Sequence, residues 1–167
     1  MSFVNHRGRR RSRRLAVKPG FTEYAKALHF RVCVRTTLNR IPTSLVCNRI
    51  EDPESCILTI TPTEPMIWNG RSLTPADGTV IAYYGSTLTL HSEWMDLSTR
   101  HVVATTTRTF HSPLPHFTVD DVVRCVVEFD QEARPKTKWL GGIDCHHVFF
   151  DGFHETSEGY YAPLWGS

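Results

Sequence analysis

One segment of this chain repeats its apolar residues with the period of an α-helix, whereas most other segments repeat them with the period of a β-strand. In HFTVDDVVRCVVEFDQEARP, five valines and one phenylalanine lie at positions 119, 122, 123, 126, 127 and 129, which are i, i+3, i+4, i+7, i+8 and i+10. That spacing places them on one face of a helix. Thr118 is a suitable N-cap, Asp121 follows it by three residues, and Pro135 follows the segment. The pattern predicts one helix, from Val119 to about Ala133.

The rest of the folded chain is predicted to be β-strand. Residues 27–38 alternate Leu, Phe and Val with His, Arg and Cys, which indicates a strand with one buried face. Further strands are expected at 56–60, 79–84, 87–93, 100–110, 145–150 and 160–165. Gly85-Ser86 has the length of a tight hairpin turn, and Asp151-Gly152-Phe153 is expected to turn the chain into its last strand. The predicted fold class is α+β: a β-rich antiparallel sheet with one prominent amphipathic helix.

The charge of the chain is divided between two parts. The overall net charge is only +2, but residues 1–20 contain no acidic residue. The remaining residues hold twelve Lys and Arg side chains against all seventeen Asp and Glu side chains. We therefore expect a disordered basic arm at 1–20 and a single folded domain at 21–167. The seven cationic residues of the arm are Arg7, Arg9, Arg10, Arg11, Arg13, Arg14 and Lys18.

The arm has several candidate roles. Clustered arginines neutralise phosphates and release counterions, which predicts contact with RNA, DNA or an acidic protein through these seven residues. The same cluster fits a nuclear localisation signal, and an acid-free, Arg-rich N-terminus also resembles a mitochondrial presequence. A solvated tail without a specific partner is the remaining alternative.

A group of cysteine and histidine residues near the C-terminus is the main candidate for chemistry. Cys145, His147 and His154 are possible metal ligands if the chain brings them together, although their spacing matches no standard zinc module. His146 and His147 would point to opposite faces of the predicted strand and so would not share one ion. The alternative is that these are ordinary polar strand residues. No phosphate-binding glycine loop or nucleophile motif is present, so we expect no cofactor and favour a protein that is not an enzyme.

The cysteines and the hydropathy bear on location. Five cysteines form no CxxC pair, which favours a reduced, intracellular protein, nuclear or cytoplasmic, with mitochondrial import left open. No apolar run of membrane-spanning length occurs in the sequence, so we expect no membrane association.

The aromatic residues have two interpretations. They could form a platform on which sugars or bases stack, or they could fill the core of a small β-rich domain, which is the commoner role. The candidates are Trp68, Trp94, Trp139, Trp165, Tyr83, Tyr84, Tyr160 and Tyr161.

The C-terminal third resembles a known family. The segments FTVDDVVRCVVEF and LGGIDCHHVFFDGFHE and the closing PLWGS are similar to a family of basidiomycete fungal proteins defined only as a domain of unknown function. The shared positions are Thr118, Val119, Asp121 and Val122 at the helix start, and Phe150, Asp151, Gly152 and Phe153 in the later segment. The resemblance implies an α+β fold and a fungal intracellular setting, and it brings no known activity.

Three functions follow as expectations. The first is a non-enzymatic binding or adaptor domain whose basic arm contacts nucleic acid or another polyanion. The second is an RNA-packaging, coat-like shell protein, because small coat proteins combine an Arg-rich arm with a β-rich body. The third and weakest is a metal- or Cys-dependent enzyme. The oligomeric state is left open.

Overall fold

The predicted helix is the centre of the molecule. The computed structural model describes residues 17–38, 41–43, 56–95, 99–139, 142–156 and 159–167. In it, α2 spans Val119–Ala133, as the apolar spacing predicts. The Thr118 hydroxyl accepts a hydrogen bond from the Asp121 backbone N–H at 3.3 Å, and the Asp121 carboxylate accepts one from the Thr118 N–H at 3.1 Å. This capping box fixes the start of the helix.

Strands of two to eleven residues surround this helix. A single-turn helix, α1 (Glu23–Lys26), and a 3-10 turn, η2 (Arg134–Lys136), complete the helical elements of the described residues. The strands are β1 (Gly20–Phe21), β2 (Leu28–Leu38), β3 (Ile41–Thr43), β4 (Cys56–Pro62), β5 (Met66–Trp68), β6 (Leu73–Pro75), β7 (Ile81–Tyr84), β8 (Thr87–Met95), β9 (Val102–His111), β10 (His116–Thr118), β11 (Lys138–Trp139), β12 (Gly142–Ile143), β13 (Phe149–Glu155) and β14 (Tyr161–Gly166). The fold is therefore α+β, mostly strand with one prominent helix.

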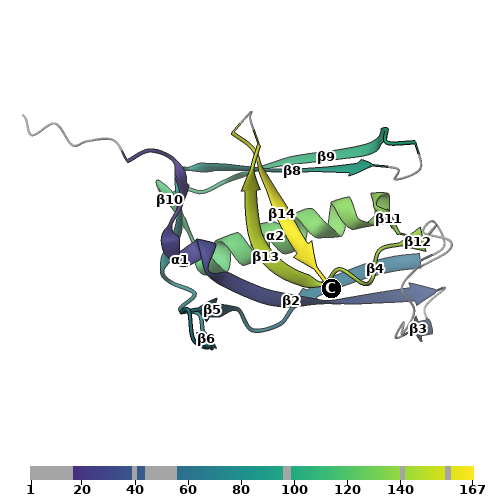
Figure 1. Cartoon of the computed structure of the whole chain (residues 1–167), viewed down its shortest axis with the longest axis horizontal. Coiled ribbons are helices and arrows are strands. Elements are labelled where there is room, and N and C mark those ends of the chain that lie inside the picture. Colours follow the sequence, from purple (N-terminus) through teal and green to yellow (C-terminus); the bar gives the residue numbers. More distant parts are fainter. Residues whose placement is uncertain (1–16, 39–40, 44–55, 96–98, 140–141, 157–158) are drawn as a thin grey trace, which may run out of the picture.

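One large sheet curves around α2. Its strand order is β6-β5-β2-β13-β14-β8-β9, with β3 and β4 also paired to the long strand β2. All pairs in it are antiparallel except β14 with β8, which is parallel. In Figure 1, α2 lies between the β8–β9 pair on one side and β2 with β4 on the other, and β13 and β14 cross in front of it. The helix thus fills the concave side of the sheet.

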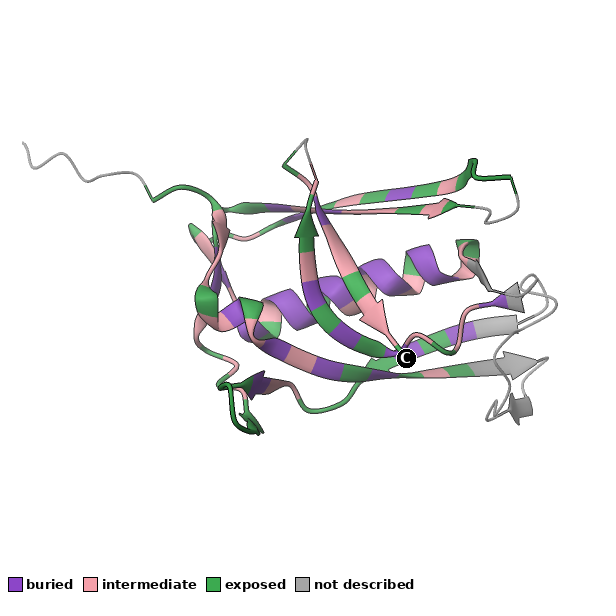
Figure 2. Ribbon diagram, viewed as in Figure 1, coloured by how far each residue is buried: buried purple, intermediate pink, exposed green. Residues whose placement is uncertain are grey.

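The core lies between the helix and this concave side. Val119, Val122 and Val126 of α2 are fully buried, and they belong to one apolar cluster with Leu28, Phe30 and Val32 of β2. Figure 2 shows the buried residues concentrated along the helix and along alternate positions of the strands. Alternation in β2 sends His29 and Arg31 to the opposite, outer side of the sheet, because successive strand residues point to opposite faces. This outer side carries the groove described below.

Two expected turns are wrong. Gly85-Ser86 does not close a hairpin, because β7 pairs with β1 and β10 in a separate three-stranded sheet while β8 pairs with β9 and β14. Asp151-Gly152-Phe153 is not a turn either. It lies inside β13, where the register with β14 shifts between Phe150 and Phe153 and Gly152 has φ +109°. The glycine allows a bulge that lets the strand continue to Glu155.

Candidate functional site

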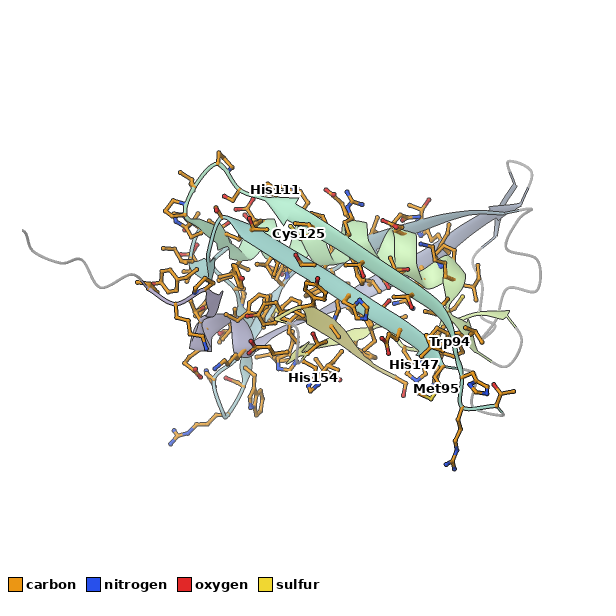
Figure 3. All side chains as sticks on the ribbon, turned by 90° about the horizontal axis from the view of Figure 1, so that it is seen from above. Trp94, Met95, His111, Cys125, His147 and His154 are labelled. Atoms are coloured by element: carbon orange, nitrogen blue, oxygen red, sulfur yellow. The ribbon has the colours of Figure 1, made fainter. Side chains whose placement is uncertain are left out.

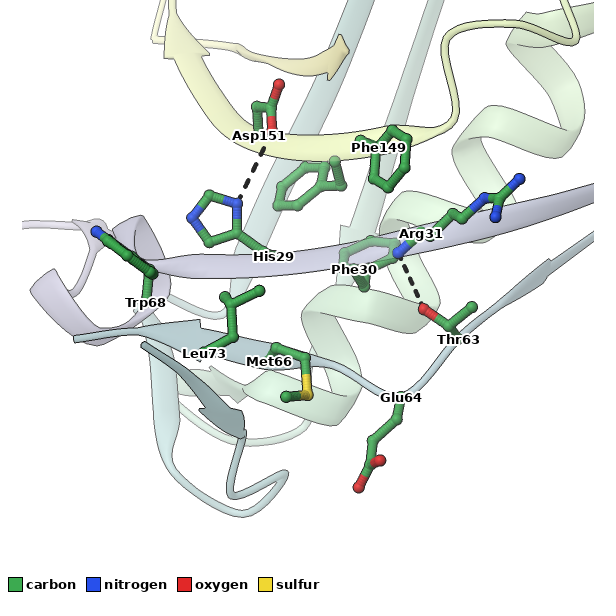
Figure 4. Close-up of a pocket in the computed structure, with 11 residues that line it drawn as sticks. His29, Phe30, Arg31, Thr63, Glu64, Met66, Trp68, Leu73, Phe149 and Asp151 are labelled. Carbon is green, nitrogen blue, oxygen red and sulfur yellow. Dashed lines mark hydrogen bonds and ion pairs between the residues drawn. The ribbon is translucent and has the colours of Figure 1, made fainter. Parts of the chain in front are cut away.

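An apolar groove of about 450 Å³ lies on the outer face of the large sheet. Its walls come from β2, β5, β6, β13 and the segment between β4 and β5 (Figure 4). The lining residues are His29, Phe30, Arg31, Thr63, Glu64, Met66, Trp68, Leu73, Phe149, Phe150 and Asp151. A groove of this size, mostly apolar with a few polar groups, has the character of a ligand-binding site.

Strand register explains why these side chains meet. Met66 of β5 is opposite His29 of β2, and Phe149 of β13 is opposite Arg31. Trp68 is paired with Leu73 across the β5–β6 hairpin. The side chains of these pairs share the outer face, and Trp68 and Phe149 are 46% and 45% exposed, respectively. Large apolar side chains gathered at such exposure on one face indicate an interaction surface.

A few polar contacts sit among the apolar walls. His29 Nδ1 lies 3.8 Å from Asp151 Oδ1, and both side chains remain partly exposed. The Arg31 guanidinium carbon lies 5.5 Å from the centre of the Phe149 ring, a cation–π contact. The Arg31 N–H donates to the Thr63 hydroxyl at 3.0 Å, which ties the segment after β4 to the groove. The groove therefore combines exposed rings with charges of both signs.

A second hollow adjoins the groove where the chain enters the body. Lys18, Gly20, Glu23, Asp151 and Glu155 are among the residues that line it. Asp151 lines both hollows, so the two are neighbours. Gly20, the last residue of the expected arm, pairs with Tyr84 of β7. Of the seven predicted arm cations, Lys18 is described and exposed, and the six arginines lie outside the described residues.

The C-terminal Cys/His segment does not form the expected strand. β13 begins at Phe149, and Cys145–Val148 is a loop. One Asp144 carboxylate oxygen accepts the backbone N–H groups of His146 and His147 at 2.8 and 3.1 Å, and the other lies 2.7 Å from His147 Nδ1. The hydrogen bonds to the Asp144 side chain hold these N–H groups in a local turn, where they do not pair with a neighbouring strand. His146 and His147 therefore do not alternate on a strand, and the prediction that they point to opposite faces of one is wrong.

A buried arginine holds this loop against the end of α2. Arg134 is 3% exposed, and its Nε donates to Asp130 Oδ2 at 2.7 Å. Its Nη1 donates to the carbonyls of Asp144 and His147 at 3.0 and 2.9 Å, and Trp165 stacks on the guanidinium at 5.1 Å. Burial raises the pKa of the Asp130 carboxyl to about 6, although the positive charge of Arg134 acts in the opposite direction. These contacts account for the polar residues of the region as structural anchors around a small cavity of about 100 Å³.

The structure does not bring the predicted metal ligands together. Within the described residues, no three His, Cys, Asp or Glu side chains are grouped so that they could hold a metal ion. Figure 3 shows His154 well apart from His147, which lies near Trp94. The Cys145 thiol donates to the Ile143 carbonyl at 3.6 Å. Burial raises the pKa of the Cys125 thiol to about 12, so this cysteine is not a ready nucleophile.

The aromatic residues divide between the two interpretations offered by the sequence. Tyr83 and Tyr161 are buried in the core, and Trp165 packs partly against it. Trp68 instead lines the outer groove, together with Phe149, which sequence analysis did not select. The available signal was the alternation in 27–38, which places His29 and Arg31 on the face away from the core. The pairing of that face with Phe149 and Trp68 depends on sheet order, which no local pattern contains.

Comparison with known proteins adds no relative. No family model matches the chain, and neither a curated protein nor a solved structure matches it. The resemblance to the basidiomycete family thus stays a prediction. Among the described helices, none is both long and apolar enough to cross a membrane.

Proposed function

We propose that this protein is a non-enzymatic adaptor whose basic arm contacts nucleic acid or another polyanion, while the folded body offers a separate binding groove. The observation that carries the proposal is the separation of charge: seven cations and no acid in residues 1–20, against an excess of acids in the rest. Polyanion binding requires a local cluster of cations rather than a basic average. An intracellular setting, nuclear or cytoplasmic, goes with this proposal.

The folded body supports the assignment of polyanion binding to the arm. Its excess of carboxylates disfavours phosphate binding over the surface as a whole, so the arm is the element suited to a polyanion. Strand β1, paired with β7, attaches the arm to the body beside the outer groove. The exposed rings of that groove supply a second contact surface on the body, apart from the arm.

The test compares the full chain with a variant that lacks residues 1–16 and so keeps β1 intact. Both are titrated with generic RNA and DNA at two salt concentrations. We expect the full chain to bind with an affinity that falls steeply with salt, because each phosphate contact releases counterions. The shortened chain should lose this binding. A full-length variant with the six arm arginines changed to serine should behave like it, whereas the arginine-to-lysine control should retain binding.

Two outcomes would contradict the proposal: no binding by the full chain, or equal binding by the chain that lacks the arm. If the arm binds an acidic protein but neither RNA nor DNA, its polyanionic partner is a protein. Light scattering on the same samples separates the adaptor from the coat-like alternative, because a shell protein would give the mass of many subunits with RNA.

A further inference from the structure

We propose that the outer groove stacks unpaired bases of a single-stranded nucleic acid on a row of three rings, those of Trp68, His29 and Phe149. The inference rests on the proposed function and deepens it, because it names the class of polyanion that the arm would deliver. All three side chains line the groove and lie on the outer face of adjacent strands. Figure 4 shows them spread from one end of the pocket to the other.

The register of the strands gives the row its geometry. Trp68 donates its backbone N–H to Ala27, two residues before His29, and Phe149 is opposite Arg31, two residues after it. Each ring is therefore displaced from the next by two residues along the strand and by one strand across the sheet. Strand dimensions make that step about 8 Å. Bases within a duplex are about 3.4 Å apart along each strand, so successive rings of this row suit only bases that are already unstacked.

Charges at the groove favour one orientation of such a strand. Arg31 lies over Phe149 at one end, and the exposed Arg71 lies in the turn that follows Trp68 at the other. Carboxylates of Asp151 and Glu64 also line the groove and repel phosphate. The bases must then face the groove and the phosphates face outward, where Arg31, Arg71 and the arm can reach them. In that orientation the carboxylates can accept hydrogen bonds from base amino groups.

An apolar protein segment is the other occupant that exposed Trp, Leu and Phe side chains suggest. Single-stranded nucleic acid is favoured by the spacing of the rings and by Arg31, which lies over the Phe149 ring at one end of the row. It is also favoured by the point at which the chain enters the body, since Asp151 lines both the groove and the hollow at that point.

The experiment uses the full chain with Trp68→Ala and Phe149→Ala combined. The probes are a short fluorescein-labelled single-stranded RNA of mixed sequence and a duplex of the same length, followed by fluorescence anisotropy at two salt concentrations. We expect affinity for the single strand to fall roughly tenfold or more, because each stacked base contributes appreciably to affinity. Affinity for the duplex and its salt dependence should not change. The control is Leu114→Ala, which removes an exposed apolar side chain that lines neither the groove nor the second hollow.

The outcomes separate the two proposals. If the double variant binds single strand and duplex as the native chain does, the base-stacking site is overturned and the groove is left to a protein segment. An equal loss for single strand and duplex would also overturn it, since stacking distinguishes the two. Restoration of the single-strand preference by Trp68→Phe with Phe149→Tyr would support it. Loss of all binding on removal of residues 1–16 tests the arm alone and does not depend on the rings.

Discussion

The two faces of the sheet at β2 and β13 use similar residues for opposite purposes. On the inner face, Phe30 and Phe150 stack at 4.7 Å between ring centres and are almost fully buried. On the outer face, Phe149 is next to Phe150 in sequence but is nearly half exposed, with an arginine over its ring. The inner face is stabilised by removal of apolar area from water, whereas the outer face keeps its apolar area available. Burial, not residue type, therefore separates the stabilising part of this sheet from its candidate binding part.

The strongest test of this contrast replaces each of two neighbouring phenylalanines with alanine in turn. Phe150→Ala should lower the free energy of unfolding by about 3–5 kcal/mol, because it leaves a cavity in the core. Phe149→Ala should change it by less than about 0.5 kcal/mol, as for other exposed positions. Urea unfolding followed by circular dichroism measures both. Equal losses for the two variants would show that the outer ring is also structural.

The same contrast applies to the charged pairs. Arg134→Ala should cost about 3 kcal/mol, because it leaves the buried Asp130 carboxyl and two backbone carbonyls without their partner. Asp151→Ala, which removes the partly exposed partner of His29, should cost less than about 1 kcal/mol. Urea unfolding at neutral pH distinguishes them. Replacing Asp130 with Asn and Arg134 with Met together should cost less than Arg134→Ala alone, since no unpaired charge remains; a larger cost would contradict this account.

The buried pair of Asp130 and Arg134 should also give stability its own pH dependence. The pKa of Asp130 is raised to about 6 in the folded chain, above its ordinary value of 3.8. The folded state therefore binds this proton more tightly than the unfolded state. Consequently the contribution of Asp130 to stability should decline as pH rises from about 4 to about 6, by at most about 3 kcal/mol, and should then level off. Asp130→Asn should lack this decline, and superimposable pH profiles for the two proteins would refute the assignment.

The smallest expected effect concerns the start of the helix that the inner face packs against. Thr118→Ala removes the hydroxyl that caps α2 and should cost about 1 kcal/mol in the free energy of unfolding. Thr118→Ser keeps the hydroxyl and should recover most of the loss in thermal unfolding. Groove binding should be unaffected in either variant, because the cap lies outside the groove.

The helix and the alternating strand β2 were predictable because their signals are local. The spacing of the valines predicts α2, and the Thr118–Asp121 pair predicts where it begins. Its observed bounds agree with the prediction. The alternation in residues 27–38 likewise predicts which residues lie on each face of β2. In α2, burial of the apolar face outweighs the modest helix propensity of valine. In β2, the polar residues between the apolar positions face outward and do not disturb the buried face.

Long-range pairing could not be predicted in the same way. The Gly85-Ser86 dipeptide has hairpin length, yet β7 and β8 pair with other strands. The sequence of Cys145–Val148 looks like strand, yet Asp144 and Arg134 hold it as a loop through contacts that no periodicity reveals. The groove is a further case, since Trp68, His29 and Phe149 meet only through the order β5-β2-β13. Sheet order is a property of the whole chain, and a single sequence does not state it.

Asp151 lines both the groove and the hollow beside the arm, so the two proposed contact sites are adjacent and could bind one strand together. Gly20 of β1 lies six residues after Arg14, and fully extended this stretch spans at most about 22 Å. A strand gripped by the arm would thus be confined near the rings at a high effective concentration, in the millimolar range for a short tether. Two individually weak contacts would then combine into one strong one without any new surface. The spacing between the arginines and β1 would set this avidity as much as the charge of the arginines does, and inserting residues there would lower the effective concentration.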